Sequence, residues 1–295
     1  MTNLDLKLFI ATVVIPAHNR NDKLERAVLS VLSQPGAGDV EIIVVDDCSQ
    51  PPLVCDYLRP QDKLLRNEVN RGAPASRNIG IHLASGKLIY LLDSDDVFLQ
   101  RDFRDDYLQY GQSEGLYYVD ILRGGTTSDF PPVMQRADFV PYAMAGGYPL
   151  IGQTSSLMFN SSQRIFFDES LPKHQDWDLV LHYLSVHGPL KKIDGMIEYD
   201  EADAASLSRT YAPEKSLPWL NKVKTDPALG CSPAEVRHMT WLILNYSTRH
   251  YAWTEWLTTC LAYLTRGKLS PWAAFKSFYL RLTKETIGAG ARRRA

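Results

Sequence analysis

Short apolar runs alternate with helix-like segments over the first hundred residues. Strands are predicted at 10–15, 40–45 and 87–92, because each is a compact run rich in Val, Ile and Leu that ends in polar residues or proline. A shorter strand is predicted around 64–65. Runs of this kind are typical of strands buried on both faces of a parallel sheet.

Two helices are predicted between these strands. Apolar residues at 24, 27, 28 and 31 recur at helical spacing, with Asn21 as the expected N-cap. The second helix opens at Ala73-Pro74 and is expected to end at Gly86. Strands that alternate with helices predict an α/β, Rossmann-like domain with a mostly parallel central sheet and flanking helices.

Polar clusters follow three of these strands, at 16–19, 46–47 and 93–96. In open α/β sheets the ligand crevice lies beyond the carboxyl ends of the strands, so these clusters are expected to converge there. Mg²⁺ or Mn²⁺ prefers carboxylate oxygens, and Mg²⁺ usually takes one or two of them together with substrate phosphates. A metal nucleotide is therefore the expected ligand. The sequence has no P-loop and no GxGxxG motif, which disfavours kinases and dinucleotide-binding enzymes.

Five motifs resemble those of family 2 glycosyltransferases of the GT-A fold, in the expected order between residues 10 and 210. They are Ala11-Thr-Val-Val-Ile-Pro-Ala-His-Asn-Arg20, Val44-Val-Asp-Asp-Cys-Ser49, Asn70-Arg-Gly-Ala-Pro-Ala-Ser-Arg-Asn-Ile-Gly80, Leu91-Leu-Asp-Ser-Asp-Asp96 and His174-Gln-Asp-Trp-Asp-Leu179. The resemblance implies a GT-A catalytic domain and an inverting transferase of bacterial surface-polysaccharide type.

The resemblance also implies roles for individual residues of the donor site. Asp47 would accept a hydrogen bond from the nucleobase, and Asp93 would bind the ribose hydroxyls. Asp95, in the DxD motif, would ligate the Mn²⁺ or Mg²⁺ that bridges the diphosphate. The remaining donor-site residues are expected to shape the nucleobase site or hold the donor, and they are Pro16, His18, Asn19 and Arg77. A structural ion pair is the alternative role for Arg77, and Asp96 is expected to cap the next helix.

Asp176 is the candidate catalytic base, which the acceptor hydroxyl needs because it is a weak nucleophile. It lies at the start of an apolar helix, where the helix dipole favours an ionised carboxylate. One base opposite the leaving group implies inversion at the anomeric carbon. Asp178 is the rival, and Trp177 is expected either to stack on an acceptor sugar or to lie in the core.

Two positions depart from the family pattern. Gln175 stands where the family usually has an acid before the base. Asp203 stands where related enzymes often have a histidine that completes the metal site. Asp203 is expected either to ligate the metal through oxygen or to be a solvated loop acid.

The C-terminal part is predicted to be a separate helical region, which divides the chain into a catalytic domain at 1–212 and a helical extension at 213–295. Residues 261–295 carry eight basic residues and one acid, and the resulting charge of +7 contrasts with −9 for residues 1–260. This basic amphipathic tail is expected either to contact the anionic inner-membrane surface or to pack on protein, including a second copy of the chain.

The balance of 32 basic against 34 acidic residues disfavours nucleic acid as a partner. Four scattered cysteines and the absence of a recognisable signal peptide favour a cytoplasmic location. The expected function is transfer of a sugar from a nucleotide-sugar, in the first place a UDP-sugar, to a glycan or lipid-linked glycan. The alternatives are a non-catalytic sugar-nucleotide-binding subunit and a nucleotidyltransferase that makes sugar nucleotides. The sequence leaves open the sugar, the acceptor and the choice among UDP, GDP and dTDP.

Overall fold

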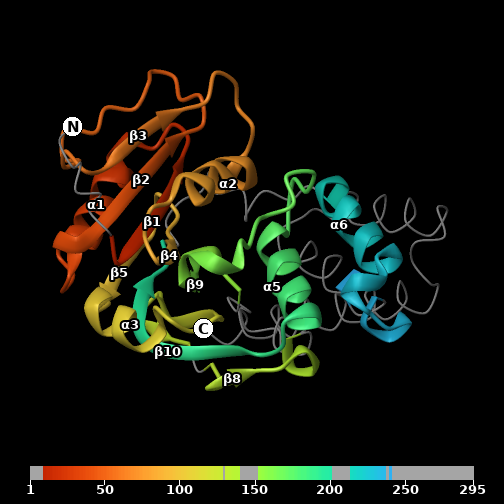
Figure 1. Cartoon of the computed structure of the whole chain (residues 1–295). Coiled ribbons are helices and arrows are strands. Elements are labelled where there is room, and N and C mark those ends of the chain that lie inside the picture. Colours follow the sequence, from red (N-terminus) through yellow and green to blue (C-terminus); the bar gives the residue numbers. More distant parts are fainter. Residues whose placement is uncertain (1–8, 129, 140–151, 201–212, 237–238, 241–295) are drawn as a thin grey trace, which may run out of the picture. The chain divides into compact units, whose positions relative to one another are not determined.

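A computed structural model describes residues 9–128, 130–139, 152–200, 213–236 and 239–240. The chain divides into two units, residues 1–203 and residues 204–295. The first unit holds all of the described sheet (Figure 1). The second contains α6 (Pro213–Thr225) and the short η4 (Pro227–Leu229), and residues 233–236 and 239–240 are also helical. The predicted domain boundary at residue 212, Asp203 and the basic tail all lie outside the described residues.

The central sheet runs in the order β3-β2-β1-β4-β9-β6-β10-β5, with β7 on β6 and β8 on β10. Its strands are β1 (Ala11–Ala17), β2 (Val40–Asp46), β3 (Lys63–Arg66), β4 (Leu88–Leu91), β5 (Val97–Gln100), β6 (Leu116–Arg123), β7 (Thr126–Thr127), β8 (Val133–Met134), β9 (Leu157–Asn160) and β10 (Leu190–Glu198).

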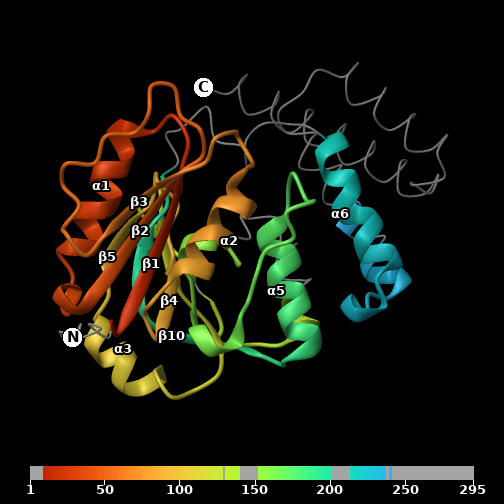
Figure 2. The same cartoon turned by 45° about the horizontal axis from the view of Figure 1, so that its top comes forward.

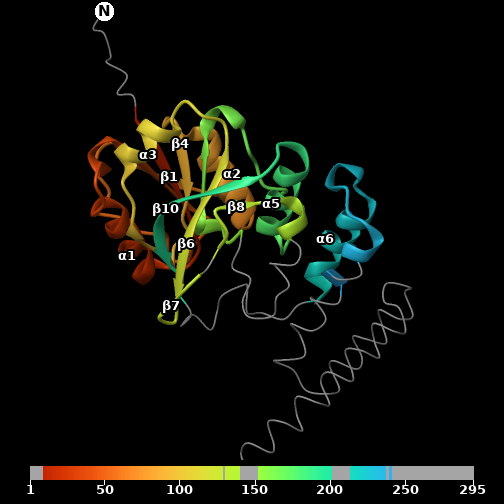
Figure 3. The ribbon, with the colours of Figure 1, turned by 90° about the horizontal axis from the view of Figure 1, so that it is seen from below.

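The four predicted strands are confirmed, and β3, β2, β1 and β4 pair in parallel. Beyond β4 the sheet is mixed, because β9 runs antiparallel to both of its neighbours. Further along the sheet, β10 is parallel to β6, which lies beside it in Figure 3, and antiparallel to β5. The mostly parallel sheet predicted from the sequence therefore describes its first half.

The first unit contains the helices α1 (Asn21–Leu32), α2 (Ala73–Leu83), α3 (Phe103–Tyr110) and α5 (Gln175–Val186), and short 3-10 turns η1 (Ala37–Asp39), η2 (Thr154–Ser156) and η3 (Ser161–Gln163). Residues 136–139 are also helical. Helix α1 lies on one side of the sheet, and α2 and α5 lie on the other (Figure 2). As its periodicity predicts, α1 buries four apolar side chains, namely Leu24, Ala27, Val28 and Val31.

Three local predictions are corrected by the structure. The N-cap of α1 is Arg20, and Asn21 is the first helical residue. Helix α2 ends at Leu83, because Ala84 is extended. Asp96 does not cap a helix: strand β5 follows it directly, and the cap of α3 is Asp102, whose carboxylate accepts from two backbone N–H groups.

Glycine is required at Gly86, just before β4. A Cβ atom there would lie 2.2 Å from the carbonyl carbon of Ala11 and 2.4 Å from the backbone nitrogen of Thr12. The Gly86 N–H donates to the Thr12 hydroxyl at 2.8 Å. This close contact holds the start of β4 against β1, which aligns the two strands whose carboxyl ends carry the candidate site.

Candidate functional site

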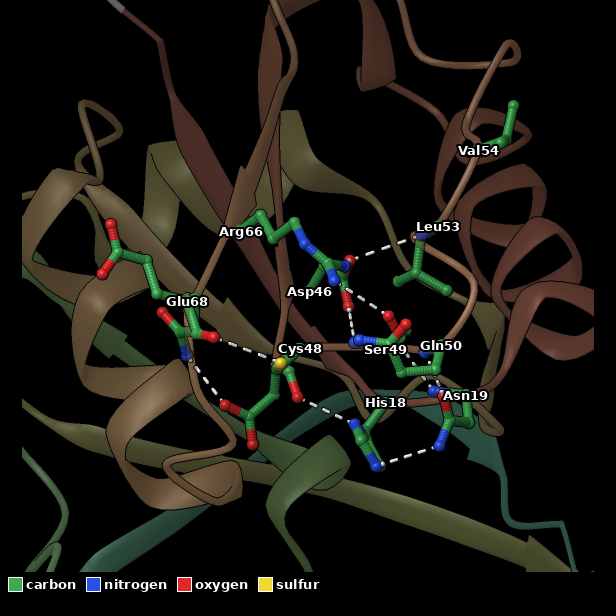
Figure 4. Close-up of polar contacts among 12 residues, drawn as sticks. His18, Asn19, Asp46, Cys48, Ser49, Gln50, Leu53, Val54, Arg66 and Glu68 are labelled. Atoms are coloured by element: carbon green, nitrogen blue, oxygen red, sulfur yellow. Dashed lines mark hydrogen bonds and ion pairs between the residues drawn. The ribbon is translucent and has the colours of Figure 1, made fainter.

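The two neighbouring carboxylates after β2 have different surroundings. Asp46 is 2% exposed and accepts from the backbone N–H groups of Ser49, at 2.8 Å, and Leu53, at 3.3 Å. It also forms an ion pair with Arg66 (Figure 4). Burial alone would raise the pKa of Asp46, but these hydrogen bonds outweigh it and lower the pKa. Asp46 therefore holds the turn after β2 together.

Asp47 is buried and holds the loop before α2. Its Oδ1 accepts from the side-chain amide of Asn67 at 2.8 Å and from the backbone N–H of Arg71 at 2.9 Å. Its Oδ2 accepts from the backbone N–H of Gly72 at 2.8 Å. Gly72 has φ +85°, a conformation that glycine adopts without strain. The Asp47 carboxylate thereby joins the end of β2 to the start of α2.

The polar residues after β1 form a hydrogen-bonded turn against the residues that follow β2 (Figure 4). His18 Nδ1 donates to the carbonyl oxygen of Asp47 at 2.7 Å, which leaves Nε2 to accept from the Asn19 amide at 3.0 Å. Asn19 has a left-handed backbone, and its Oδ1 accepts from the Gln50 N–H at 2.7 Å. Pro16 is buried within β1, opposite Val45. His18 and Asn19 are thus the exposed members of this group.

Arg77 from α2 brings together carboxylates from two other elements. It is 5% exposed, and its Nη2 donates to Asp93 Oδ1, after β4, at 2.5 Å. The charges of both Arg77 and Asp93 act on the Asp176 carboxylate of α5. Two further N–H groups of Arg77, Nε and Nη1, are buried without a hydrogen-bond partner among the described residues. Two of the predicted donor-site residues, Arg77 and Asp93, thus lie near the predicted base.

The Phe167 ring packs against the guanidinium of Arg77. The guanidinium carbon lies 5.2 Å from the centre of the Phe167 ring, a cation–π distance. Asn78, the next residue of α2, fixes Phe167 by accepting from its N–H at 2.8 Å and donating to its carbonyl at 2.9 Å. The position of Arg77 is therefore set by packing as well as by its ion pair with Asp93.

Asp176 and Asp178 are separated by their surroundings. Asp176, the second residue of α5, accepts from the N–H of Trp177 at 2.9 Å and is partly exposed. Burial raises its pKa to about 6; hydrogen bonding and the charge of Arg77 oppose the rise, and that of Asp93 adds to it. Asp178 is 4% exposed. Asp176 is thus the carboxylate that combines access with the charges of the site.

The N-cap of α5 is His174, which has a left-handed backbone. Its ring lies 5.0 Å from that of Trp177, centre to centre. Burial, together with the charge of Lys173, lowers the pKa of His174 to about 3. The imidazole beside the candidate base is therefore neutral at physiological pH.

Asp93-Ser94-Asp95-Asp96 forms the DxDD segment after β4. Two of its acids, Asp96 and Asp95, differ in their surroundings. Asp96 is 1% exposed and accepts from Gln153 Nε2 at 2.7 Å, Ser155 Oγ at 2.5 Å and the Asp200 N–H at 3.1 Å. Burial, followed by the charges of Asp93 and Asp95, raises its pKa well above the ordinary value. Asp95 is partly exposed, and burial and Asp93 raise its pKa to about 6.

Gln153 and Ser155 were not predicted from the sequence. Ser155 Oγ also accepts from the backbone N–H of Asp93 at 2.9 Å, so it orients both Asp93 and Asp96. The available signal was the polar run at 152–156 directly before the buried strand β9. No local pattern indicates that this run meets the DxDD segment, which lies about sixty residues earlier.

Comparison with known proteins fits this geometry. A family model described as "Glycosyl transferase family 2" matches residues 12–133, which include all the predicted donor-site residues and Asp95. The chain carries a family 2 glycosyltransferase domain. The resemblance inferred from the five motifs is confirmed at the level of the family.

Two curated relatives match part of the chain. Succinoglycan biosynthesis protein ExoO from Rhizobium meliloti is 44% identical over 89 residues, which is 29% of this chain and 25% of ExoO. The Escherichia coli UDP-Glc:alpha-D-GlcNAc-diphosphoundecaprenol beta-1,3-glucosyltransferase WfgD is 33% identical over 94 residues, 31% of this chain and 37% of WfgD. The matched segment spans about a quarter to two-fifths of these relatives.

The glycosyltransferase domain also matches a solved structure. The crystal structure of S. aureus TarS 1-349 in complex with UDP-GlcNAc aligns with a TM-score of 0.55 and 15% identity, covering 82% of this chain and 73% of that one. This likeness confirms the GT-A fold and nothing finer. Within the described part of the chain, no helix is both long and apolar enough to cross a membrane.

Proposed function

We propose that this chain is an inverting glycosyltransferase that transfers a sugar from a UDP-sugar to a hydroxyl group of a glycan or lipid-linked glycan. The observation that carries the proposal is the meeting of Arg77, Asp93 and Asp176 beside Asp95, within a family 2 domain. These residues come from three separate elements and combine a cation, a binding carboxylate and a base.

The donor nucleoside binds along the carboxyl ends of β1, β2 and β4. The exposed His18 and Asn19 contact the base over the buried Pro16, and Asp93 binds the ribose. Asp47, whose carboxylate already accepts three hydrogen bonds, keeps one lone-pair direction for the base, since a carboxylate has about four. UDP is the proposed nucleotide because WfgD is named for UDP-Glc and TarS was crystallised with UDP-GlcNAc.

The donor set fits a Mg²⁺ or Mn²⁺ ion held by few protein ligands. Among the described residues no group of three or more His, Cys, Asp or Glu side chains is arranged to hold a metal. Asp95 is partly exposed, whereas Asp93 is paired with Arg77 and Asp96 is buried and hydrogen-bonded. One carboxylate is enough when substrate phosphates complete the coordination. Asp95 would hold the ion, with Asp203 as a second candidate ligand, and the ion would neutralise charge on the leaving diphosphate.

Asp176 acts as the base that accepts the proton of the acceptor hydroxyl. With a pKa of about 6 it is mostly ionised at pH 7, yet more basic than an ordinary aspartate. The acceptor oxygen attacks the anomeric carbon opposite the diphosphate, so one bond forms as the sugar–phosphate bond breaks, with inversion. The positive charge of Arg77 favours the ionised form of Asp176, because it lowers the pKa of that carboxyl.

The acceptor is proposed to belong to bacterial surface-polysaccharide synthesis. In support, ExoO is named for succinoglycan biosynthesis, and WfgD is named for an acceptor linked to diphosphoundecaprenol. A lipid-linked acceptor suits a cytoplasmic enzyme at the inner face of the inner membrane. The basic residues of 261–295 are proposed to provide that contact. The same tail is the proposed place of any self-association.

Calorimetric titration of UDP, GDP and dTDP into the purified chain, with Mn²⁺ and with EDTA, tests the donor site. We expect metal-enhanced binding of UDP. No binding of any nucleotide by a folded chain would refute the donor site, while binding without sugar transfer to any acceptor would favour a non-catalytic subunit. Formation of a sugar nucleotide from a nucleoside triphosphate would indicate a nucleotidyltransferase.

The variants Asp176→Asn and Asp178→Asn test the base, since both lie on the first turn of α5. Asp176→Asn is expected to lower kcat about 10²–10⁴-fold with unchanged UDP affinity, the usual contribution of a general base. Asp178→Asn should keep most of the activity if circular dichroism shows it folded. The reverse ranking would assign the base to Asp178.

A further inference from the structure

The first turns of α1 carry three cations that face the DxDD segment. Arg20 is the N-cap of α1, and Lys23 and Arg26 follow one and two turns later. Arg26 Nη2 donates to the backbone carbonyl of Asp95 at 3.0 Å. Arg20 and Lys23 lie near enough for their charges to act on the Asp95 carboxylate. This side of α1 therefore lies against the proposed metal ligand.

Lys23 forms an ion pair with Asp200, which lies 177 positions later in the sequence. Its Nζ lies 2.9 Å from Asp200 Oδ2, and the two side chains are 21% and 11% exposed. Arg26 lies 3.7 Å from the same oxygen. The backbone N–H of Asp200 donates to Asp96 Oδ1 at 3.1 Å, so Asp200 is fixed to the DxDD segment as well. The Lys23–Asp200 pair thus lies directly beside the proposed site of the diphosphate.

The cluster places cations beside the proposed site of the donor phosphates. Lys23 and Arg26 lie next to the DxDD segment, and one acid of that segment, Asp93, is already paired with Arg77. A lysine ammonium has three donor hydrogens and a flexible stem, so it can leave or share a carboxylate for a phosphate. The cluster lies at the carboxyl edge of β1, where the proposed nucleotide binds.

We propose that Lys23, with Arg20 beside it, binds the diphosphate of the nucleotide donor, and that Asp200 competes with the diphosphate for the Lys23 ammonium. The inference rests on the proposed function and adds a phosphate-binding subsite on α1 to the metal at Asp95. The cations stabilise the diphosphate both in the bound donor and as the leaving group. Asp200 holds the ammonium in place when no nucleotide is bound.

The ion pair offers a test in which two variants act in opposite directions. Binding of UDP and of uridine is measured by calorimetry with the full chain in EDTA, which removes metal from the comparison. Lys23→Met should weaken UDP binding about tenfold, as for loss of a hydrogen bond to a charged group, and leave uridine binding unchanged. Asp200→Asn should tighten UDP binding about two- to fivefold, the value of a partly exposed ion pair, again without affecting uridine.

Arg104→Gln provides the matched control, because it removes one positive charge at a side chain that is 68% exposed and pairs with Asp39. It should leave both affinities unchanged. Damage to the fold would weaken UDP and uridine binding together in both variants. The subsite is refuted if Lys23→Met affects UDP and uridine equally, or if Asp200→Asn fails to tighten UDP. Wild-type chain that binds neither ligand, with or without metal, would refute the proposed function itself and the subsite with it.

Discussion

The protonation of Asp176 should set the acid side of the activity profile. Its pKa of about 6 implies that about 90% of the carboxyl is ionised at pH 7 and about 10% at pH 5. Because only the ionised form accepts a proton, kcat should fall about tenfold for each pH unit below 6. An ordinary aspartate, near 3.8, would give a flat profile over the same range.

The structure assigns opposite effects on this pKa to two neighbours. The charge of Arg77 lowers the pKa of Asp176 and that of Asp93 raises it. Arg77→Met should therefore move the acid limb to higher pH by about one unit, the low end of the effect of a nearby opposite charge. Asp93→Asn should move it to lower pH. Both variants are expected to be less active, so the position of the limb is the quantity to compare.

The assay is release of the nucleoside diphosphate from pH 4.5 to 8.5, with donor, acceptor and Mn²⁺ saturating. Saturation matters because the pKa of Asp95 is also about 6, and its protonation would weaken donor binding. At saturating donor, the titration of Asp95 changes the KM of the donor but not kcat. The acid limb of the kcat profile could instead keep its position in both variants, or shift in the same direction in both. Either result would show that Asp176 is not the titrating base.

Three further outcomes are expected. Gly86→Ala should lower the free energy of unfolding, measured by urea denaturation, by about 3 kcal/mol or more, because its Cβ would overlap backbone atoms of β1. Gly38→Ala is the control: a Cβ there has nothing within 4 Å, so the free energy of unfolding should change by less than about 0.5 kcal/mol. Arg66→Met should cost about 1–2 kcal/mol at pH 7. Because the pKa of Asp46 is lowered, that difference should shrink as the pH falls below 3.8. Asp95→Asn should weaken UDP binding about tenfold with Mn²⁺ and leave it unchanged in EDTA.

The sequence was enough to predict the parallel half of the sheet and the family. Three of those strands, β1, β2 and β4, are apolar runs, and polar residues follow each of them, including the acids after β2 and β4 that carry part of the proposed chemistry. Such signals are local, because a strand is recognised by a few adjacent residues and its carboxyl end by the polar residues that follow. The segment carrying Asp176 is equally compact, so its motif was also visible.

The contacts that each acid makes became visible only in the tertiary structure. Asp46 and Asp47 are adjacent in sequence, yet one pairs with Arg66 and the other with the loop before α2. Asp96 looked like a helix cap, but it is buried against Gln153 and Ser155.

The contacts behind these roles join residues far apart in the chain, and Lys23 and Asp200 are 177 positions apart. Periodicity and capping rules describe neighbours within a few residues, whereas burial and charge pairing depend on which distant segments the mixed half of the sheet brings together. The same physical limit explains why β9, antiparallel between β4 and β6, and the residues it positions were not predicted.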